Sequence, residues 1–263
     1  MLFILKSYLN FLWNSKNEHG VHSPFVFDLV TKCFYDTKKY TEYSILKEYR
    51  KSLLKNKNYI EVTDFGAGSK VFKSNKRQIS KIAQTAGISQ KRAELLFQIT
   101  NYFKPDSVLE LGTSLGLATS SLALGNPKAT ITSLEGCKNT IAVAKNLFEV
   151  QNSKFKVENV NFINTEFLNY LGDSQLLTSN FQLIYFDGNH SKLATLNYFE
   201  SLLPTISNES VWIFDDIHWS PEMEEAWEII KNHPQVTVSI DTFLWGIVFF
   251  RTEQEKEHFV IRI

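Results

Sequence analysis

Residues 108–116 read VLELGTSLG, an apolar run that passes through two glycines into a helical pattern. The run from Ser107 to Leu111 is typical of a buried strand, and residues 117–124 are typical of a helix. Gly112 and Gly116 remove Cβ atoms at the turn, so a ligand could approach the backbone there. The start of the helix offers N–H groups to an anionic group. The stretch predicts a ligand-binding turn between a strand and a helix.

The pattern continues along the chain, because short β-branched or aromatic runs alternate with helical stretches from residue 107 onward. Strands are expected at 107–111, 129–134, 159–163, 182–186 and 211–215, with helices at 117–124 and 138–151. Two more strands, 236–240 and 243–250, are separated by two residues only, which is hairpin spacing. We expect an α/β fold with a doubly wound, mostly parallel seven-stranded sheet, closed by an antiparallel C-terminal hairpin.

The first 106 residues have a different character and predict an N-terminal helical extension to an α/β domain at residues 107–263. Helices are expected at 41–54, 77–86 and 90–103, and this part is expected to cap the carboxyl edge of the sheet. Residues 1–13 predict an amphipathic helix that packs on the body or on a second subunit of a homodimer. Attachment to a membrane surface is the alternative, since the segment is too short to span a bilayer.

Composition narrows the class of protein. The 28 Lys and Arg residues balance 28 Asp and Glu residues, which leaves no broad positive field for nucleic acid, so no nucleic-acid partner is expected. Apolar residues make up 43% of the chain, enough to build a compact core. Cys33 and Cys137 lie far apart without C-x-x-C spacing, so neither a disulfide nor a zinc site is expected, and a cytoplasmic location fits best.

Glycine spacing argues against a dinucleotide. The dinucleotide fingerprint G-x-G-x-x-G would need glycine at position 114, where this chain has Ser114. About twenty residues further on, the next strand ends in Glu135, whose carboxylate could accept both hydroxyls of a ribose. A simple tight turn is the alternative for the glycines. Residues 64–69, DFGAGS, also imitate a nucleotide-binding turn but lack a following acid, and predict a loop near the substrate entrance or a structural turn.

Residues 110–116 together with Glu135 resemble the first two motifs of class I S-adenosylmethionine-dependent methyltransferases. The resemblance implies that the glycine turn lines the methionine end of S-adenosylmethionine, that Glu135 holds its ribose, and that the residues after the third strand lie near its adenine. The cofactor-binding residues implied in this way are Glu110, Gly112, Thr113, Ser114, Gly116, Glu135, Thr165, Glu166 and Asp187.

Acidic residues end two later strands, at Asp187 and at the pair Asp215 and Asp216. Parallel strands bind ligands at their carboxyl edge, and three carboxylates gathered there would repel one another without a cation. Hard oxygen ligands suit magnesium or another divalent cation. The residues therefore predict a metal site. The alternative is that Asp187 is an acid near the cofactor, while Asp215 and Asp216 cap the helix that begins near Pro221 or form hydrogen bonds to the N-terminal cap.

The same strand ends resemble, more narrowly, the catechol-type and macrolide-sugar-type metal-dependent O-methyltransferases. The match implies Asp187, Asp215 and Asp216 as metal ligands and places His190 where catechol-type enzymes have a general-base lysine. A histidine side chain titrates near neutral pH, which suits proton abstraction, so His190 and Asp187 are the expected catalytic residues. Trp219 is a candidate substrate contact. The likeness covers residues 90–251; the rest is only loosely similar to uncharacterised bacterial methyltransferases.

The sequence departs from the catechol-type pattern at one position and leaves two alternative functions open. Ala118 stands where catechol-type enzymes often carry a serine for the donor's carboxylate, and Thr119 beside it is a possible substitute. The favoured function is O-methylation of a small molecule with help from a divalent metal. The alternatives are a metal-independent methyltransferase for a macromolecule, with the N-terminal helices as docking surface, and a cofactor-binding protein without catalysis.

Overall fold

The computed structural model describes residues 2–65, 72–155, 159–173 and 179–263. These residues form two compact units. The central unit comprises residues 37–169, and the terminal unit joins residues 1–36 with residues 170–263. The boundary expected at residue 106 does not coincide with this division and stays a prediction.

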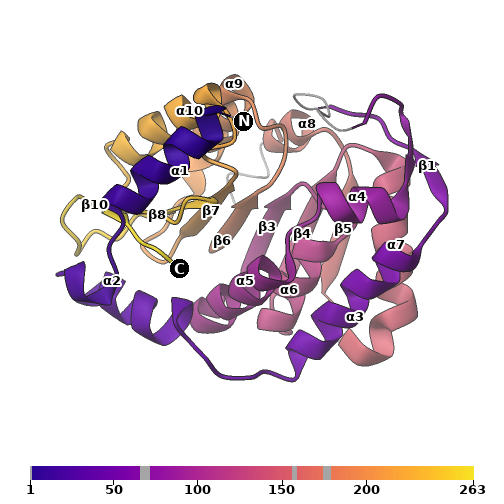
Figure 1. Ribbon diagram of the computed structural model, residues 1–263, viewed down its shortest axis with the longest axis horizontal. Helices are drawn as coiled ribbons and strands as arrows, with labels where there is room; N and C mark the ends of the chain where they lie inside the picture. Colours follow the sequence, from indigo (N-terminus) through magenta and orange to yellow (C-terminus); the bar gives the residue numbers. More distant parts are fainter. Residues whose placement is uncertain (1, 66–71, 156–158, 174–178) are drawn as a thin grey trace. The chain divides into compact units, whose positions relative to one another are not determined.

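The central unit is built around three parallel strands, in the order β3, β4, β5 (Figure 1). They are β3 (Ser107–Leu111), β4 (Thr130–Glu135) and β5 (Val160–Asn164). Helix α6 (Leu117–Gly125) connects the first pair and α7 (Lys138–Phe155) the second, and α8 (Phe167–Leu171) follows β5. Because the strands run parallel, their carboxyl ends lie at one edge, with Glu135 opposite Asn164 in the register.

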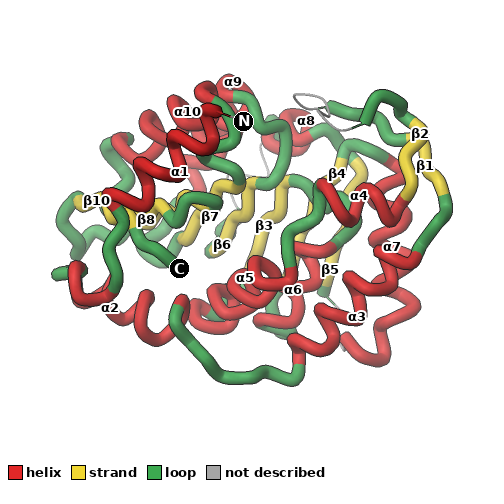
Figure 2. The backbone as a smooth tube through the Cα atoms, in the orientation of Figure 1, coloured by secondary structure: helices red, strands yellow, loops and turns green. Residues whose placement is uncertain are grey.

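Three more helices and a hairpin complete the central unit. The helices α3 (Glu42–Lys55), α4 (Ile79–Thr85) and α5 (Gln90–Phe103) lie close to the predicted ranges. The hairpin, visible as two short yellow segments in Figure 2, pairs β1 (Tyr59–Glu61) with β2 (Lys76–Gln78) antiparallel. It was not predicted, because a three-residue strand such as Lys-Arg-Gln shows no apolar alternation. Residues 66–69 of the glycine-rich turn lie outside the described residues.

The terminal unit carries the remaining strands, in the order β10, β8, β9, β7, β6. Strands β6 (Leu183–Phe186) and β7 (Val211–Asp215) are parallel, and β9 (Trp245–Phe249) runs antiparallel to both β7 and β8 (Val238–Asp241). The expected hairpin is therefore confirmed. Strand β10 (Glu257–Val260), parallel to β8, adds an eighth strand to the seven that were expected. It has only one buried residue, so the hydrophobic pattern of the sequence did not reveal it.

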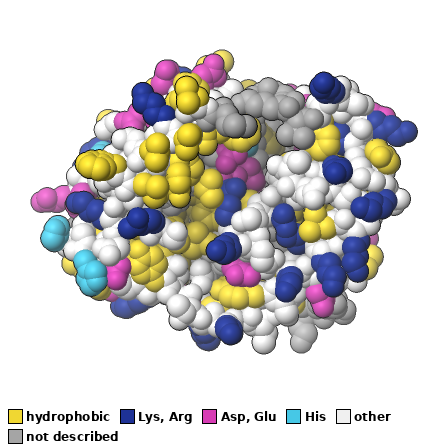
Figure 3. Space-filling model, viewed as in Figure 1, with side chains coloured by type: hydrophobic (Ala, Val, Ile, Leu, Met, Phe, Trp, Pro, Cys, Tyr) yellow, Lys and Arg dark blue, Asp and Glu magenta, His cyan; other side chains and the backbone are white. Residues whose placement is uncertain are grey.

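Helices α9 (Lys192–Leu202) and α10 (Pro221–Asn232) pack against each other in the terminal unit, where α1 (Leu2–Asn14), α2 (Pro24–Leu29) and the π-helical turn Val30–Phe34 also belong. Helix α1 contacts the unit through aromatic rings, with the Tyr8 and Phe11 centroids 4.8 and 5.5 Å from that of Phe243. Apolar side chains gather over α1 in Figure 3, and its most exposed ones are Leu2, Leu5, Leu9 and Trp13.

The α/β class, the mostly parallel strands and the antiparallel C-terminal pair are confirmed by this architecture. The amphipathic N-terminal helix is present as α1. None of the helices in the described ranges is long and apolar enough to cross a membrane.

Candidate active site

The turn between β3 and α6 adopts an unusual backbone conformation. Gly112, Ser114 and Gly116 have positive φ values of 111°, 47° and 79°. The Gly112 and Thr113 N–H groups both donate to the carbonyl of Leu134 at 3.0 Å, which ties the turn to the end of β4. Non-glycine residues adopt such φ values at a cost, so the turn is held by these contacts.

Gly116 is required by protein packing. A Cβ atom there would lie 2.5 Å from the Tyr49 hydroxyl and 3.1 Å from the Cβ of Ala144. The expectation that this missing Cβ makes room for a ligand is therefore not supported, since side chains of α3 and α7 occupy that space. The fully buried Tyr49 donates its hydroxyl to the Leu115 carbonyl at 2.8 Å. The sequence contained no motif that singled out Tyr49.

Glu135 sits at the end of β4 with a preorganised carboxylate. Its Oε2 accepts the Ser114 N–H at 2.9 Å and its Oε1 accepts the Cys137 N–H at 2.8 Å. A carboxylate has about four lone-pair sites, so each oxygen can accept a further hydroxyl. Burial raises the pKa of the Glu135 carboxyl, these two N–H donors act in the opposite direction, and the charge of Asp64 adds to the rise.

The strand next to β4 supports the same turn from its other side. Asn164 donates its side-chain N–H groups to the carbonyls of Glu135 and Gly136 at 2.7 and 2.9 Å. The Thr165 N–H donates to the Glu135 carbonyl at 3.1 Å, which places Thr165 beside that residue. The exposed Glu166 follows at the start of α8, where its carbonyl accepts the N–H of Asn169. Contacts of Thr165 and Glu166 with adenine stay predictions.

Glu110 is fully buried inside β3. Its Oε2 accepts the Thr119 hydroxyl at 2.6 Å and the Ser133 hydroxyl at 2.5 Å. Its Oε1 is buried and has no hydrogen-bond partner among the described residues. Burial raises the pKa of this carboxyl to about 7. Because Thr119 is fully buried against Glu110, it is poorly placed to replace the serine that Ala118 lacks.

In the terminal unit, the turn after β6 brings His190 back toward Asp187. Asn189 adopts a positive φ of 48°, and its carbonyl accepts the Ser191 N–H at 2.6 Å. As a result, His190 Nε2 lies 3.6 Å from Asp187 Oδ1, and both side chains keep part of their surface exposed. The two residues expected to be catalytic are thus an ion pair when His190 is protonated.

The end of β7 is arranged differently. Asp215 is 4% exposed, and its carboxylate accepts the Tyr185 hydroxyl at 3.3 Å and the Asp216 N–H at 2.8 Å. Helix α10 is capped by Ser220, whose hydroxyl accepts the Met223 N–H at 3.2 Å. The alternative in which Asp215 and Asp216 cap this helix is therefore wrong, because Ser220 already does so.

Asp187, Asp215 and Asp216 are the three acids that the sequence predicts as ligands of a divalent cation. Across the ranges that the structure describes, no three His, Cys, Asp or Glu side chains are grouped so that they could hold a metal ion. Asp187, Asp215 and Asp216 thus do not form a preformed metal site. The Asp215 carboxylate instead accepts hydrogen bonds from Tyr185 and from the Asp216 N–H. Metal assistance stays a prediction.

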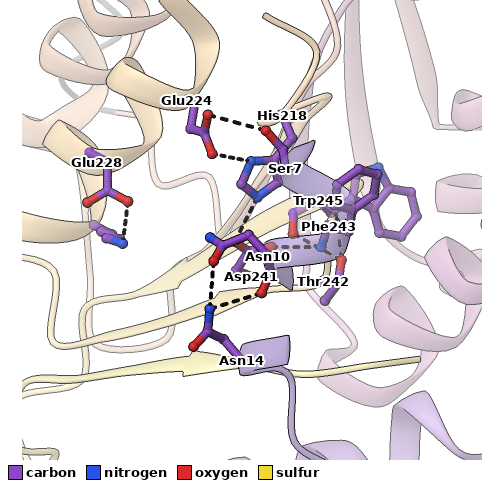
Figure 4. A network of polar contacts seen from close by, with 11 residues as sticks. Ser7, Asn10, Asn14, His218, Glu224, Glu228, Asp241, Thr242, Phe243 and Trp245 are labelled. Atoms are coloured by element: carbon purple, nitrogen blue, oxygen red, sulfur yellow. Dashed lines mark hydrogen bonds and ion pairs between the residues drawn. The ribbon is translucent and has the colours of Figure 1, made fainter. Parts of the chain in front are cut away.

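His218, two residues after Asp216, belongs to a polar network that also includes Ser7 of α1 (Figure 4). Its Nδ1 lies 3.1 Å from Glu224 Oε1 and its Nε2 lies 2.8 Å from Asp241 Oδ2. Burial alone would lower the pKa of His218, but the hydrogen bonds and charges of Asp241 and Glu224 outweigh it and raise the pKa. Its ring stacks on Phe243 with 5.2 Å between centroids, so His218 joins loops and helices within the unit.

Tryptophans in this unit divide by exposure. Trp212, Trp227 and Trp245 are buried, as expected for core residues. Trp219 is 39% exposed, so its role as a substrate contact stays a prediction.

Comparisons with known proteins agree with this geometry. Residues 109–217 match the model of a family described as a methyltransferase domain. No match was found among curated proteins. Among solved structures, the chain is similar to an O-methyltransferase from Bacillus cereus in complex with SAH, with a TM-score of 0.54 and 16% identity over 82% of this chain and 94% of that chain.

Two further structures share the fold. A Podospora anserina methyltransferase bound to SAH gives a TM-score of 0.57 and 14% identity over 88% of this chain and 97% of that chain. The O-methyltransferase TomG from Streptomyces achromogenes, in complex with SAM, gives 0.56 and 13% over 90% of this chain and 99% of that chain. Residues 109–217 therefore match a methyltransferase domain, and the chain shares its fold with these methyltransferase structures.

Proposed function

We propose that this protein transfers the methyl group of S-adenosylmethionine to a hydroxyl of a small molecule. The observation that carries the proposal is the Glu135 carboxylate, held by the N–H groups of Ser114 and Cys137 at the end of a parallel strand. A carboxylate in this place suits two ribose hydroxyls. O-methyltransferases from Bacillus cereus and Streptomyces achromogenes share the fold and were solved with SAH and SAM, which supports the same class of reaction.

The donor would be held by the central unit. Glu135 would accept the ribose hydroxyls, and the N–H groups at the start of α6 would receive the carboxylate of the methionine part. Thr165 would lie toward the adenine, since its N–H is bonded to the Glu135 carbonyl. When bound, S-adenosylmethionine supplies a methyl group on a positively charged sulfur that becomes a neutral thioether after transfer.

The proton of the acceptor hydroxyl would pass to His190. Asp187 Oδ1, 3.6 Å from His190 Nε2, stabilises the imidazolium that forms when the ring accepts this proton. The deprotonated oxygen is the stronger nucleophile, so general-base catalysis favours its attack on the methyl carbon. Asp187 and His190 support this role because their side chains lie 3.6 Å apart, whereas the Asp215 carboxylate already accepts the Tyr185 hydroxyl.

Location and assembly are further parts of the proposal. Cys33 and Cys137 are buried thiols outside any disulfide, in keeping with a reducing cytoplasm. A homodimer through the exposed side of α1 stays a prediction.

Calorimetric titration with SAM and SAH tests the donor site. We expect Glu135→Ala to weaken both Kd values on the order of 100-fold, because charge-assisted hydrogen bonds to the ribose are lost. Glu135→Gln, which keeps the shape and removes the charge, is the matched control and should be intermediate. Wild-type protein that binds neither compound would rule out the proposed function.

A panel of small hydroxyl compounds tests the acceptor class, with SAH formation as the readout. Turnover in the presence of a chelator would show that no divalent metal is needed, and turnover restored only by Mg²⁺ would show that one is. Donor binding without turnover on any small molecule would favour the macromolecular or the non-catalytic alternative.

A further inference from the structure

The β1–β2 hairpin of the central unit lies on the turn that carries Glu135. The Asn139 side chain donates to the Glu61 carbonyl at 2.8 Å, and the Thr63 N–H lies 3.4 Å from the sulfur of Cys137. These two anchors connect the end of β1 and the residues after it with Cys137 and the first turn of α7. The hairpin is therefore fixed next to the acid that is proposed to hold the ribose.

Phe65 makes the closest approach. A Cβ atom built on Gly136 would lie 2.6 Å from Cδ2 of the Phe65 ring, far inside van der Waals contact. Glycine at this position is therefore what allows the ring to lie on the backbone directly after Glu135. The same ring is still 47% exposed, although a phenylalanine is normally buried. One side of the ring is thus supported by the turn, and part of the rest faces solvent.

Asp64, the residue before Phe65, is held by an ion pair with Arg77. Asp64 Oδ2 lies 3.2 Å from Nη2 of Arg77 on β2, and the Arg77 side chain is 11% exposed. Arg77 in turn lies over the Phe72 ring at 5.0 Å. An ion pair of which one member is largely buried restricts the backbone at residue 64, so it positions the neighbouring Phe65.

We propose that Phe65 is an aromatic wall of the donor site, against which the adenosine of S-adenosylmethionine packs. The inference rests on the proposed function, because it takes Glu135 to be the ribose acid. Gly136 has no side chain to offer the nucleoside, and the Phe65 ring occupies the space that such a side chain would take. Every base has a π-face, and a phenyl ring supported on one side is suited to contact it.

Titration calorimetry with SAH and with 5′-methylthioadenosine tests the proposal, since the second compound keeps the adenosine and lacks the amino acid. We expect Phe65→Ala to weaken both compounds by the same factor, about 10-fold, and Phe65→Trp to bind like wild type. Tyr59→Ala is the matched control, because Tyr59 is an exposed aromatic residue on the same hairpin, and it should stay within about twofold of wild type.

A double-mutant cycle with Gly136→Ala sharpens the test. The added methyl group must displace the Phe65 ring, so Gly136→Ala should weaken SAH binding in wild type and have no further effect in Phe65→Ala. Thermal unfolding without ligand should show all variants folded. Independent effects of the two changes, or a Tyr59→Ala loss equal to that of Phe65→Ala, would mean that the hairpin is only structural.

The outcomes separate this inference from the proposed function. If Glu135→Ala loses SAH while Phe65→Ala binds it normally, the wall is refuted and the donor site stands. If Phe65→Ala weakens SAH but leaves 5′-methylthioadenosine unchanged, the ring does not contact adenosine. If wild-type protein binds neither compound, both proposals fall.

Discussion

Glu135 and Asp215 both end a buried parallel strand, yet their carboxylates are held in different ways. Glu135 accepts N–H groups from two loops that flank it and remains half-buried, with lone pairs left for a ligand. Asp215 is 4% exposed and accepts the hydroxyl of Tyr185, a side chain from the neighbouring strand. The same sequence signal thus produces a carboxylate open to a ligand in one unit and a largely buried one in the other.

An acid at the end of a strand can serve a ligand only if its carboxylate keeps free acceptor sites. Backbone donors hold the Glu135 carboxylate in place without consuming all of its acceptor capacity. In the terminal unit Asp187 Oδ1 lies 3.6 Å from Nε2 of His190, a side chain that can accept and release a proton. Under the proposed function, backbone-supported geometry would bind the donor, and a side-chain pair would carry the proton.

The largest expected effect comes from His190→Ala, measured as kcat with an acceptor from the hydroxyl panel. Loss of a general base should lower kcat by about 10²- to 10⁴-fold, while the Kd for SAH stays unchanged. Asp215→Asn is the comparison variant and should lose much less activity. Equal losses of kcat in the two variants would show that Asp215 takes part in the chemistry, through a cation or directly.

A second test concerns the buried carboxyl of Glu110, whose pKa in the folded protein is raised to about 7. A raised pKa means that the folded state binds the proton more tightly than the unfolded state, so stability should fall as pH rises from about 4.5 to about 7. The loss should be about 3 kcal/mol. Urea denaturation of wild type and Glu110→Gln across this range should show a steeper fall of stability with pH in wild type, because the raised pKa of Glu135 contributes equally to both proteins.

A smaller pH dependence in Glu110→Gln would assign that part of the stability change to the buried Glu110 carboxyl. Glutamine keeps an acceptor for Thr119 and Ser133 without a charge, so Glu110→Gln should be the more stable protein above pH 7. An unchanged slope in Glu110→Gln would assign the pH dependence to another group.

The smallest expected effect is that of Tyr185→Phe, which removes the hydroxyl that donates to Asp215. Unfolding in urea should show a loss of about 1 kcal/mol, because a buried carboxylate oxygen has one donor fewer. SAH binding should be unaffected, since Tyr185 lies in the other unit. A large loss of activity without loss of stability would show that the end of β7 serves catalysis.

Local patterns in the sequence were sufficient for much of the fold. Strands β3 and β7 coincide with their predicted bounds, because their apolar runs are flanked by clear turn signals. The short strands β1, β2 and β10 were missed, since three or four largely exposed residues leave no periodic pattern. Pairing with strands distant in sequence, and the Asp64–Arg77 ion pair for the hairpin, hold these segments in place.

The sequence alone was enough to place the glycine turn after β3, Glu135 at the end of β4 and His190 close to Asp187, because these placements depend on residue type and position at a strand end. Only the folded chain showed that Tyr49 requires Gly116 and that Phe65 requires Gly136. It also showed that Tyr185 engages Asp215. These contacts join residues separated by tens of positions, and side-chain packing across such distances leaves no local trace in the sequence.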